Sequence, residues 1–342
     1  MKQVWIPRIG EPEVLEVREA PDPEPQPGQV RVRVRAAGIN FADILARMGL
    51  YPDSPKLPAV VGYEVAGEVD GVGDGVEGLA DGDRVVCMTR FGGYSDVVCV
   101  PRNAVRPLPD GLGFEEVASI PVNWLTAWLM LVRLGGVRSG ERVLVHACAG
   151  GVGLAAVQIC RHFGAEVIGT ASSGKHERLG EMGVGACIDY RSQDFEEEVG
   201  KLTDGRGVDI VLDAVGGVSF AKSYRCLADL GRLFVFGASS LAPGTKRNMV
   251  AALGGVMRMP SFKPLRMMKQ NRGVFGVNLA HLWHRGEEMS AMLGEIVDLF
   301  ADGTFRPMVD RSFTFDEAAA AHRYIQERKN FGKVVLTPAH AR

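Results

Sequence analysis

The fold of this chain is decided by Arg142-Val-Leu-Val-His-Ala-Cys-Ala-Gly-Gly-Val-Gly-Leu-Ala-Ala-Val-Gln-Ile-Cys160. Its early residues, Val143 to Val145, form a short apolar run without helical period, which predicts a strand buried on both faces of a parallel sheet. Helical periodicity returns at Leu154, after a sharp turn that is allowed by three glycines, Gly150, Gly151 and Gly153. This order of strand, turn and helix brings bare N–H groups and the positive end of a helix dipole against a pyrophosphate.

The glycine turn matches the dinucleotide fingerprint G-x-G-x-x-G only in part, because Cys148 stands in place of the first glycine. On the turn alone, an ordinary tight strand-to-helix connection remains an alternative. A membrane span is a second alternative, since Val143 to Cys160 carries no Asp, Glu, Lys or Arg. The clustered glycines, one polar histidine, one glutamine and the marginal length argue against a span.

The end of the next strand, expected over Glu166 to Thr170, indicates which dinucleotide binds. The adenosine ribose should be contacted there, about 20 residues after the turn. The available residues are Ala171, Ser172, Ser173 and Lys175, and none is a carboxylate. A carboxylate would bind the two ribose hydroxyls of NAD and repel a 2′-phosphate, whereas small hydroxyls and a lysine would bind that phosphate. We therefore predict NADPH as the cofactor, although Lys175 alone could be a solvated turn lysine.

Length and composition indicate an ordinary soluble chain with room for two domains, since 46% of the 342 residues are hydrophobic and 23% are charged. The net charge of −2 gives no indication of a nucleic-acid partner, and we expect none. The cysteines form no C-x-x-C pair, which suits a reducing cytosol. Because Met1 to Arg8 lacks the apolar core of a signal peptide, we expect a cytoplasmic protein. A second uncharged run, Val117 to Val132, contains Pro121 and is too short to span a bilayer comfortably.

Two patterns divide the chain. Up to about Val100, short β-type runs are punctuated by Gly and Pro, and Val30 to Arg35 alternates apolar and basic residues, as a strand with one buried and one wet face does. Later, strands alternate with helices, with strands expected at Val143–His146, Val167–Thr170, Cys187–Tyr190, Val208–Val215, Arg232–Gly237 and Arg272–Leu279. This alternation predicts a doubly wound parallel sheet. We expect residues 1–122 and 281–342 to form a β-rich domain and residues 123–280 to form the domain of the parallel sheet.

Two helical regions stand out. Phe114 to Ile120 begins a helix with acidic residues in its first turn, and Pro121 interrupts that helix. Further on, apolar residues at helical spacing predict one core-facing stripe: Met289, Met292, Leu293, Ile296 and Phe300. Core packing explains this stripe better than a methionine-rich binding surface.

Several motifs resemble, in order and approximate spacing, those of the medium-chain dehydrogenase/reductase superfamily and its zinc-free quinone oxidoreductase branch: Gly38-Ile-Asn-Phe-Ala-Asp43, Arg47-Met-Gly-Leu-Tyr-Pro52, Pro58 to Gly62 and Ala147 to Gly153. Within that branch, three segments are most similar to the vesicle amine transport protein group, also known as synaptic vesicle membrane protein homologues: Gly169 to Glu177, Gly244 to Asn248 and Glu327 to Val334. The resemblance covers essentially the whole chain. It implies an α/β fold, in which a Rossmann domain with a doubly wound parallel sheet accompanies a β-rich GroES-like catalytic domain.

The resemblance also bears on mechanism, because the chain departs from the zinc alcohol dehydrogenases of the superfamily. Where those enzymes carry the cysteine and histidine ligands of the catalytic zinc, this chain has Asn40 and Tyr63, and their four-cysteine lobe has no counterpart around Cys87 to Val100. Zinc needs three or four nitrogen or sulfur ligands, so we expect no metal site. Without a Lewis acid, hydride delivery to a quinone or an α,β-unsaturated carbonyl is favoured over alcohol oxidation, because it needs only positioning and hydrogen bonds.

By resemblance, the cofactor contacts are Asn40 and Thr126 near the nicotinamide ribose, Gly150, Gly151 and Val152 at the pyrophosphate, Ser172, Lys175 and Tyr190 around the 2′-phosphate, and Phe275, Val277 and Asn330 at the nicotinamide. From the residues alone, two of these have structural alternatives. Tyr190 could be a half-buried aromatic at a strand end, and Thr126 could bond to the preceding turn of its own helix.

Tyr51 is the candidate group facing the substrate, because a phenol can donate to a carbonyl oxygen and still stack on a flat ring. A turn tyrosine packing on Pro52 is an equal alternative. Asn40 and Asp43 complete the candidate catalytic set, and the resemblance implies that Asp43 orients a neighbour near the lost zinc position. The last proton can come from water, so no dedicated general acid is required.

One segment is strongly basic. No Asp or Glu occurs between Asp229 and Glu287, whereas Arg and Lys recur throughout. Lys246 to Lys269 interleaves these charges with apolar residues and could form an amphipathic lid beside the cofactor cleft, binding an anionic substrate tail, the acidic face of a carrier protein or a membrane surface. A solvated charge pattern over a helix pair is the alternative.

Together these features predict an NADPH-dependent, zinc-free oxidoreductase that transfers hydride to a quinone or an α,β-unsaturated carbonyl. An enoyl-thioester reductase, acting on an enoyl-CoA or acyl-carrier substrate, is the nearest alternative because it shares the fold and the hydride chemistry. A third possibility is an NADPH-binding membrane or protein interaction factor with little turnover, which the basic segment favours and the cofactor motifs oppose. The resemblance alone implies a homodimer formed through the last Rossmann strand.

Overall fold

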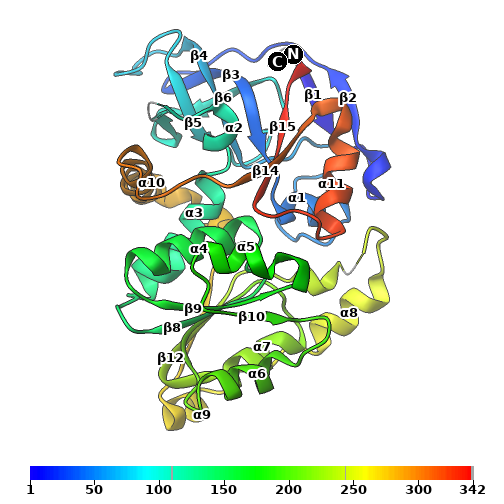
Figure 1. Ribbon diagram of the computed structural model, residues 1–342. Coiled ribbons are helices and arrows are strands. Elements are labelled where there is room, and N and C mark those ends of the chain that lie inside the picture. Colours follow the sequence, from blue (N-terminus) through cyan, green and yellow to red (C-terminus); the bar gives the residue numbers. More distant parts are fainter. Residues whose placement is uncertain (109–110, 243, 340–342) are drawn as a thin grey trace. The chain divides into compact units, whose positions relative to one another are not determined.

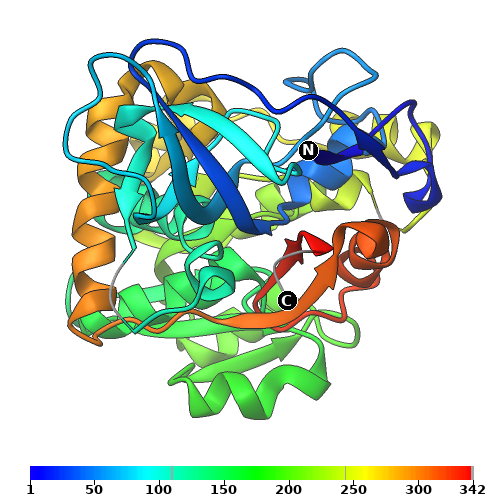
Figure 2. The same cartoon turned by 90° about the horizontal axis from the view of Figure 1, so that it is seen from above.

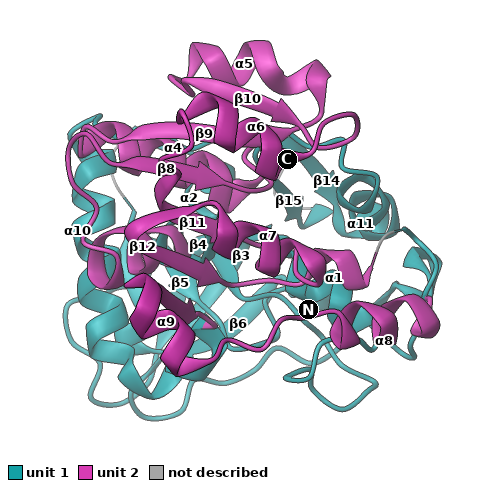
Figure 3. Cartoon of the chain, turned by 90° about the horizontal axis from the view of Figure 1, so that it is seen from below, with its two compact units in different colours: residues 1–125, 244–247, 279–342 teal, residues 126–243, 248–278 magenta. Residues whose placement is uncertain are grey.

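The computed structural model describes residues 1–108, 111–242 and 244–339. The chain divides into two compact units, which are coloured separately in Figure 3. Unit 1 consists of residues 1–125, 244–247 and 279–342, and unit 2 consists of residues 126–243 and 248–278. Unit 2 is therefore inserted in sequence between two parts of unit 1.

Unit 1 is built on a seven-stranded sheet of order β14-β15-β3-β4-β5-β7, in which β6 pairs with β3 (Figure 1). Its strands are β3 (Gln29–Gly38), β4 (Glu64–Val72), β5 (Arg84–Met88), β6 (Val97–Pro101), β7 (Val105–Pro107), β14 (Val309–Thr314) and β15 (Lys333–Thr337). A separate pair joins β1 (Lys2–Trp5) to β2 (Glu16–Glu19). The alternation predicted for β3 is confirmed, because Val30, Val32 and Val34 are fully buried.

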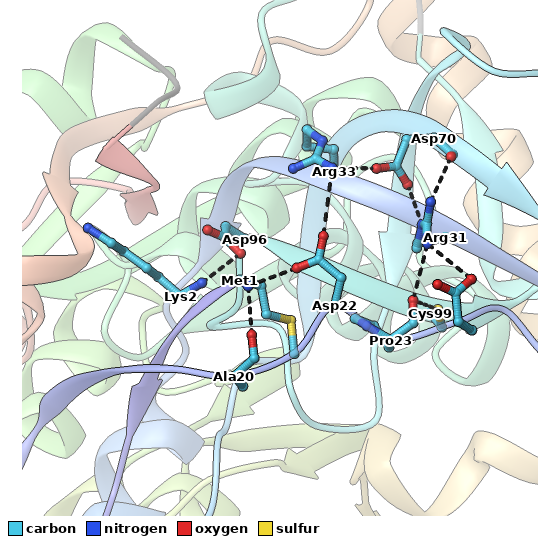
Figure 4. A network of polar contacts seen from close by, with 11 residues as sticks. Met1, Lys2, Ala20, Asp22, Pro23, Arg31, Arg33, Asp70, Asp96 and Cys99 are labelled. Carbon is cyan, nitrogen blue, oxygen red and sulfur yellow. Dashed lines mark hydrogen bonds and ion pairs between the residues drawn. The ribbon is translucent and has the colours of Figure 1, made fainter.

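The wet face of β3 carries an ion-pair network (Figure 4). Arg31 and Arg33 both contact the Asp70 carboxylate, at 2.9 and 2.8 Å. Arg33 also lies 3.9 Å from Asp22, which accepts a hydrogen bond of 2.7 Å from the amino group of Met1. These charges are partly exposed, so each pair contributes little stability, but together they fasten the first residues of the chain onto β3.

The helices of unit 1 are α1 (Phe41–Arg47), α2 (Phe114–Val117), α10 (Gly286–Ala301) and α11 (Ala318–Gln326), and α3 (Pro121–Trp128) passes into unit 2. The predicted apolar stripe lies on α10, the long orange helix of Figure 2, and all five of its residues are buried. At its end, Phe300 meets Trp124 edge to face, with 4.7 Å between ring centroids. The prediction that this stripe faces the core is therefore confirmed.

Unit 2 contains a six-stranded parallel sheet of order β10-β9-β8-β11-β12-β13. Its strands are β8 (Arg142–Val145), β9 (Glu166–Ala171), β10 (Ala186–Asp189), β11 (Val208–Asp213), β12 (Leu227–Val235) and β13 (Gly273–Gly276). The helices are α4 (Gly151–His162), α5 (His176–Glu181), α6 (Phe195–Leu202), α7 (Val218–Arg225), α8 (Met249–Met257) and α9 (Pro264–Gln270). The strand order reverses between β8 and β11, and a dinucleotide binds at the carboxyl ends of strands where such a reversal occurs.

The basic segment, Lys246 to Lys269, contains two short helices, α8 and α9. α8 contains no charged residue, yet most of its large apolar side chains are exposed: Met249 52%, Val250 84%, Leu253 62%, Val256 50% and Met257 77%. On α9, Leu265 and Met268 are 81% and 70% exposed. The charged residues precede or follow α8 or lie on α9, so the segment contains both apolar and basic groups.

One helical stretch of the described residues, 114–134, is long and apolar enough to cross a membrane. Most of it is buried inside the protein, as the core helix of a globular protein would be. Pro121 starts α3 within this stretch, and residues 129–134 form a π-helix. Length and composition are therefore weak evidence for a span here.

Candidate functional site

The glycine turn predicted to hold the pyrophosphate joins β8 to α4 in unit 2. Gly150 is the N-cap residue of α4, and no side chain caps the helix. The N–H groups of Gly151 and Val152 therefore have no acceptor within the helix. A Cβ atom on Gly153 would lie 2.3 Å from the carbonyl oxygen of Cys148, so only glycine permits this close approach of helix to loop. The turn thus fits a pyrophosphate by its backbone.

The residues predicted around a 2′-phosphate follow two neighbouring strands. Asp189 of β10 pairs with the last residue of β9, so Ser172 and Tyr190 follow side by side at the carboxyl edge of the sheet. Lys175, half-buried, closes the turn that begins at Ser172. The Arg191 guanidinium lies 6.0 Å from the Tyr190 ring centroid and adds a second cation.

A carboxylate that the sequence reasoning did not consider also lies at this edge. Asp189 accepts a hydrogen bond of 3.0 Å from the backbone N–H of Arg191, and this bond is the main cause that holds the Asp189 pKa below its ordinary value. The strand end at β9 lacks a carboxylate, as the sequence predicted, but the neighbouring strand end supplies one. This edge of the sheet therefore has two cations, Lys175 and Arg191, and one carboxylate, Asp189, which already accepts a hydrogen bond from the backbone.

The remaining predicted contacts of unit 2 lie on β13 and α3. Phe275 stacks on Phe234, with ring centroids 5.1 Å apart and planes at 16°, so its side chain is occupied by core packing. Val277 follows the strand and donates its backbone N–H to Val235 at 2.9 Å. Thr126 is a buried residue of α3, 8% exposed. The backbone contacts of Phe275 and Val277 with a nicotinamide stay a prediction, and the N–H of Val277 is already bonded.

In unit 1, Asn40 is held between two buried charges. Its Nδ2 donates to Oε1 of Glu64 at 2.9 Å, and its Oδ1 accepts from Nζ of Lys333 at 2.8 Å. Lys333 also forms an ion pair with Glu64. The second carboxylate oxygen of Glu64 accepts from the backbone N–H of Val122 at 2.7 Å. The amide of Asn40 is therefore fixed in one orientation by a carboxylate and an ammonium group.

Asp43 holds the backbone on both sides of this site. Its Oδ2 accepts from the N–H of Asn40 at 2.7 Å and from the Tyr94 hydroxyl at 3.1 Å, and its Oδ1 accepts from the N–H of Gly62 at 3.0 Å. Burial raises the pKa of Asp43 to about 7. One carboxylate thus ties α1 to the segment that carries Tyr63.

The bond from Tyr94 continues into the core. The Tyr94 hydroxyl lies 3.4 Å from Nε2 of His322, and Nε of Arg47 donates to Nδ1 of that histidine at 3.3 Å. Because a guanidinium only donates, Nδ1 is the acceptor and Nε2 carries the proton. Burial lowers the pKa of His322 and that of Arg47, the latter to about 10. Arg47 also donates to Gln326 at 2.6 Å and to the Gly10 carbonyl at 2.7 Å, so this buried cation is satisfied by neutral acceptors.

Tyr51 packs, half-buried, against the core of unit 1. It lies near Tyr63, whose pKa is raised by burial first and then by the neighbouring Asp43 and Tyr51. The Tyr63 ring contacts Phe91 at 5.5 Å between centroids. Asn330 donates from Nδ2 to the carbonyl of Gly332 at 2.8 Å, just before β15. The structure therefore groups Tyr51, Tyr63 and Asp43, whereas sequence reasoning had singled out Tyr51 alone as the group facing the substrate.

Sequence reasoning also assigned no role to the charged residues that fix Asn40. Lys333 and Glu64 each stand at the start of a strand whose next residues are apolar. A charge that opens a buried strand is a weak signal, because such positions are usually solvated strand ends. Only the pairing of β15 with β3, next to β4, brings the two charges together.

The donor set around Asn40 does not fit a zinc ion. The Lys333 ammonium already bonds to the Asn40 oxygen, and a second cation there would be repelled. Among the described residues, no three His, Cys, Asp or Glu side chains gather as metal ligands.

A GroES-like β unit and a doubly wound sheet with a glycine turn after its first strand define a medium-chain dehydrogenase/reductase. Two family models match accordingly, the alcohol dehydrogenase GroES-like domain over residues 26–110 and the zinc-binding dehydrogenase over residues 182–336.

Comparison with known proteins narrows this class. The human synaptic vesicle membrane protein VAT-1 homolog is 41% identical over 304 residues, which cover 89% of this chain and 77% of that protein. The Escherichia coli quinone oxidoreductase complexed with NADPH superimposes with a TM-score of 0.86 at 30% identity, over 99% of this chain and 100% of that chain. CurK enoyl reductase gives 0.85 at 29%, over 98% and 99%. The chain belongs to the medium-chain dehydrogenase/reductase superfamily of oxidoreductases, in the group of the VAT-1 homologs.

The prediction of a cytoplasmic protein is wrong. The relatives at 41% and 42% identity are named synaptic vesicle membrane proteins, so the names of these relatives indicate a vesicle membrane rather than the plain cytoplasm. The prediction rested on the lack of a signal peptide core. A search for the apolar core of a signal peptide detects export, but it does not detect a protein that binds a membrane by its surface.

Proposed function

We propose that this chain is an NADPH-dependent, zinc-free reductase of a quinone or an α,β-unsaturated carbonyl. The observation that carries the proposal is the uncapped N-terminus of α4, with Gly153 packed against the preceding loop, beside strand ends that bear Lys175 and Arg191. This arrangement suits a pyrophosphate followed by a 2′-phosphate. The similarity to a quinone oxidoreductase complexed with NADPH supports the same assignment.

The bound nicotinamide would supply the hydride, and the residues of the chain bind and orient. The pyrophosphate would be held by Gly150, Gly151 and Val152, and the 2′-phosphate by Ser172, Lys175 and Tyr190. The nicotinamide end would be contacted by Thr126, Phe275 and Val277 of unit 2 and by Asn40 and Asn330 of unit 1. Asn40 can keep a fixed orientation because Glu64 and Lys333 hold its amide. Tyr51 would donate a hydrogen bond to the acceptor's carbonyl oxygen and so stabilise negative charge there. Asp43 fixes the backbone at Asn40 and Gly62, because its carboxylate accepts from both N–H groups.

The acceptor is decided by one experiment. We would measure anaerobic NADPH oxidation by the full chain against a panel of quinones, small enones and enoyl thioesters, with NADH in parallel. Turnover of quinones or enones with NADPH supports the proposal. Turnover restricted to enoyl-CoA or enoyl-carrier substrates favours the enoyl-thioester reductase, which similarity to CurK enoyl reductase also supports. Equal use of NADH contradicts the 2′-phosphate pocket.

The pocket is tested separately by Lys175→Glu. A charge reversal beside a 2′-phosphate should raise the KM for NADPH by about 10-fold or more and leave the KM for NADH almost unchanged. Arg178→Glu is a matched control on the exposed face of α5. If both variants change the two KM values equally, Ser172, Lys175 and Tyr190 do not form the pocket.

A second candidate function is binding to an anionic membrane surface by residues 246–269, and an acidic carrier protein is the alternative partner. The exposed apolar residues of α8 and α9 share one segment with basic residues that lie on α9 and beside both helices, and no Asp or Glu occurs in that segment, as expected of a segment that binds anionic lipid headgroups. Reversal of three charges, Lys263→Glu, Arg266→Glu and Lys269→Glu, should abolish sedimentation with phosphatidylserine vesicles. Reversal of Arg161, Arg178 and Lys201 is the charge-matched control. Equal binding by both triple variants contradicts this candidate.

A homodimer through β13 remains part of the proposal. β13 is the last strand of the six-stranded sheet, and its outer edge can pair with the same strand of a second copy. Sedimentation equilibrium of the full chain tests this directly, since a mass near 36.9 kDa would contradict it.

A further inference from the structure

Unit 2 contains a buried polar chain that the proposed cofactor contacts do not use. It runs through Thr170, His146, Ser223 and Asp213, whose side chains are 2%, 3%, 0% and 0% exposed. Thr170 lies on β9, His146 directly follows β8, Asp213 ends β11 and Ser223 lies on α7. The chain therefore joins three strand ends across the point where the strand order reverses.

The directions of the hydrogen bonds in this chain of side chains follow from its carboxylate and from a neutral imidazole at His146. The Ser223 hydroxyl donates to Oδ2 of Asp213 at 2.7 Å, because an ionised carboxylate only accepts. The Ser223 oxygen lies 3.0 Å from Nε2 of His146 and must accept from it, so Nε2 carries the proton. Nδ1 then accepts from the Thr170 hydroxyl at 3.1 Å. Each donor has one acceptor, and the histidine is neutral.

The electrostatic surroundings agree with a neutral histidine. Burial lowers the pKa of His146, and the carboxylate of Asp213, 4.0 Å from Nε2, opposes that effect only in part. The Phe195 ring of α6 packs edge to face on the imidazole, at 4.5 Å between centroids. A protonated His146 would lose its acceptor for Thr170. The serine between histidine and aspartate is not an activated nucleophile, since its hydroxyl donates to the carboxylate and Nε2 of His146, which carries a proton, cannot accept another.

The same carboxylate shapes the loop after β11. Oδ1 of Asp213 accepts from the N–H groups of Val215 and Gly216, at 2.7 and 3.3 Å. Its Oδ2 accepts a second hydroxyl, that of Ser219, at 2.7 Å. Ser219 and Ser223 thus donate to one oxygen from one helix, but only Ser223 continues to His146 and Thr170.

We propose that Ser223 is a positioning residue for the nucleotide, because it locks the carboxyl ends of β8, β9 and β11 into one arrangement. Thr170 stands two residues before Ser172, at which the 2′-phosphate pocket is proposed, and His146 stands just before the glycine turn. This series of hydrogen-bonded side chains therefore sets the spacing between the glycine turn at the pyrophosphate and the residues at the adenosine end of the cofactor. The assignment of this spacing to NADPH rests on the proposed function, whereas the lock itself does not.

The first test needs no cofactor. Hydrogen–deuterium exchange of the full chain is compared for Ser223→Ala and Ser219→Ala, which remove the same hydroxyl from the same helix and the same acceptor. Ser223→Ala should speed exchange in residues 170–175 by about 5- to 10-fold, as loss of one buried hydrogen bond implies, and Ser219→Ala should leave that segment unchanged. Equal exchange in the two variants overturns the proposal.

The second test removes a hydrogen bond at the Thr170 end of this series of side chains. It keeps the proposal testable if Ser223→Ala does not fold. Thr170→Val should give the same faster exchange. The double variant Thr170→Val/Ser223→Ala should exchange no faster than either single variant, because both substitutions interrupt the same series of hydrogen bonds. In selectively ¹⁵N-labelled protein at pH 8, neutral His146 should carry its proton on Nε2. An Nδ1–H tautomer overturns the proposal.

Measurement of NADPH binding distinguishes the positioning role of Ser223 from the proposed function. Ser223→Ala and Thr170→Val should each raise the Kd for NADPH by about 5- to 10-fold, and Ser219→Ala should not. If the wild-type chain binds no NADPH, the proposed function fails while exchange and tautomer still decide the lock. If wild type binds NADPH and all three variants bind equally, the positioning role fails.

Discussion

The buried carboxylate of Asp43 gives the sharpest prediction of pH dependence. Its pKa is about 7 in the folded chain against an ordinary value of 3.8, chiefly because burial disfavours the ionised form. Between pH 4 and pH 7 the folded state therefore holds a proton that the unfolded state has lost. Stability falls as pH rises through this window and levels off above pH 7. The pKa difference corresponds to about 4 kcal/mol.

Tyr94→Phe perturbs this carboxylate, and it also removes the acceptor of Nε2 of His322. In the wild-type protein, the Tyr94 hydroxyl donates to Oδ2 of Asp43 at 3.1 Å, and this hydrogen bond lowers the Asp43 pKa. The variant removes that hydroxyl. A hydrogen bond to a charged group contributes about 1.5–3 kcal/mol, so its loss should raise the pKa by about one to two pH units. The fall in stability should then extend to pH 8 or above, whereas Asp43→Asn should abolish it.

The assay is the free energy of unfolding in urea at intervals from pH 5 to pH 9. Buried His322 contributes the opposite slope, because its lowered pKa favours folding at higher pH, so each variant is compared with wild type and not with a flat line. Tyr324→Phe is the matched control, since Tyr324 donates to the partly exposed Asp310 at 2.9 Å. If Asp43→Asn retains the wild-type pH dependence, the reasoning about Asp43 is refuted.

Three further predictions concern single side chains. Gly153→Ala should raise the Kd for NADPH by about 10-fold or more, because a Cβ would lie 2.3 Å from a backbone oxygen; calorimetric titration checks this. Lys333→Met should destabilise the chain by about 3–5 kcal/mol by leaving Glu64 buried without its cation, and adding Glu64→Gln should recover part of the loss in urea unfolding. Met292→Ala should cost about 2–5 kcal/mol as a core cavity, and a thermal midpoint equal to that of wild type would contradict this.

Much of the architecture could be predicted because it depends on local patterns. The run Val143 to Val145, the glycine turn and the following helix are recognisable from period and turn chemistry alone, and the structure has β8, the turn and α4 there. The alternation in β3 and the stripe on α10 also follow from one-sided burial. Strands β1, β7 and β14 were not singled out from the sequence, because they are short or carry charged residues on their wet face.

The polar interior could not be predicted, because it depends on contacts between distant residues. Lys333 and Glu64 are 269 positions apart, and Arg47 and His322 are 275 apart. Their burial is unusual for such side chains and has no local pattern. The relation of Ser223 to His146 likewise requires α7 to pack beside the ends of β8 and β11. Helical pattern locates a helix, but it does not tell which of its serines meets a distant histidine.

The place of β15 in the sheet has a consequence for how the protein is made. β15 lies between β14 and β3, although it is synthesised more than 290 residues after β3. During translation, unit 2 can close its parallel sheet while the sheet of unit 1 still lacks an inner strand. Until Lys333 emerges, Glu64 has no cation and cannot be buried at low cost. Unit 1 can therefore complete its sheet only after β15 has been synthesised, and until then β3 lacks one of its neighbouring strands.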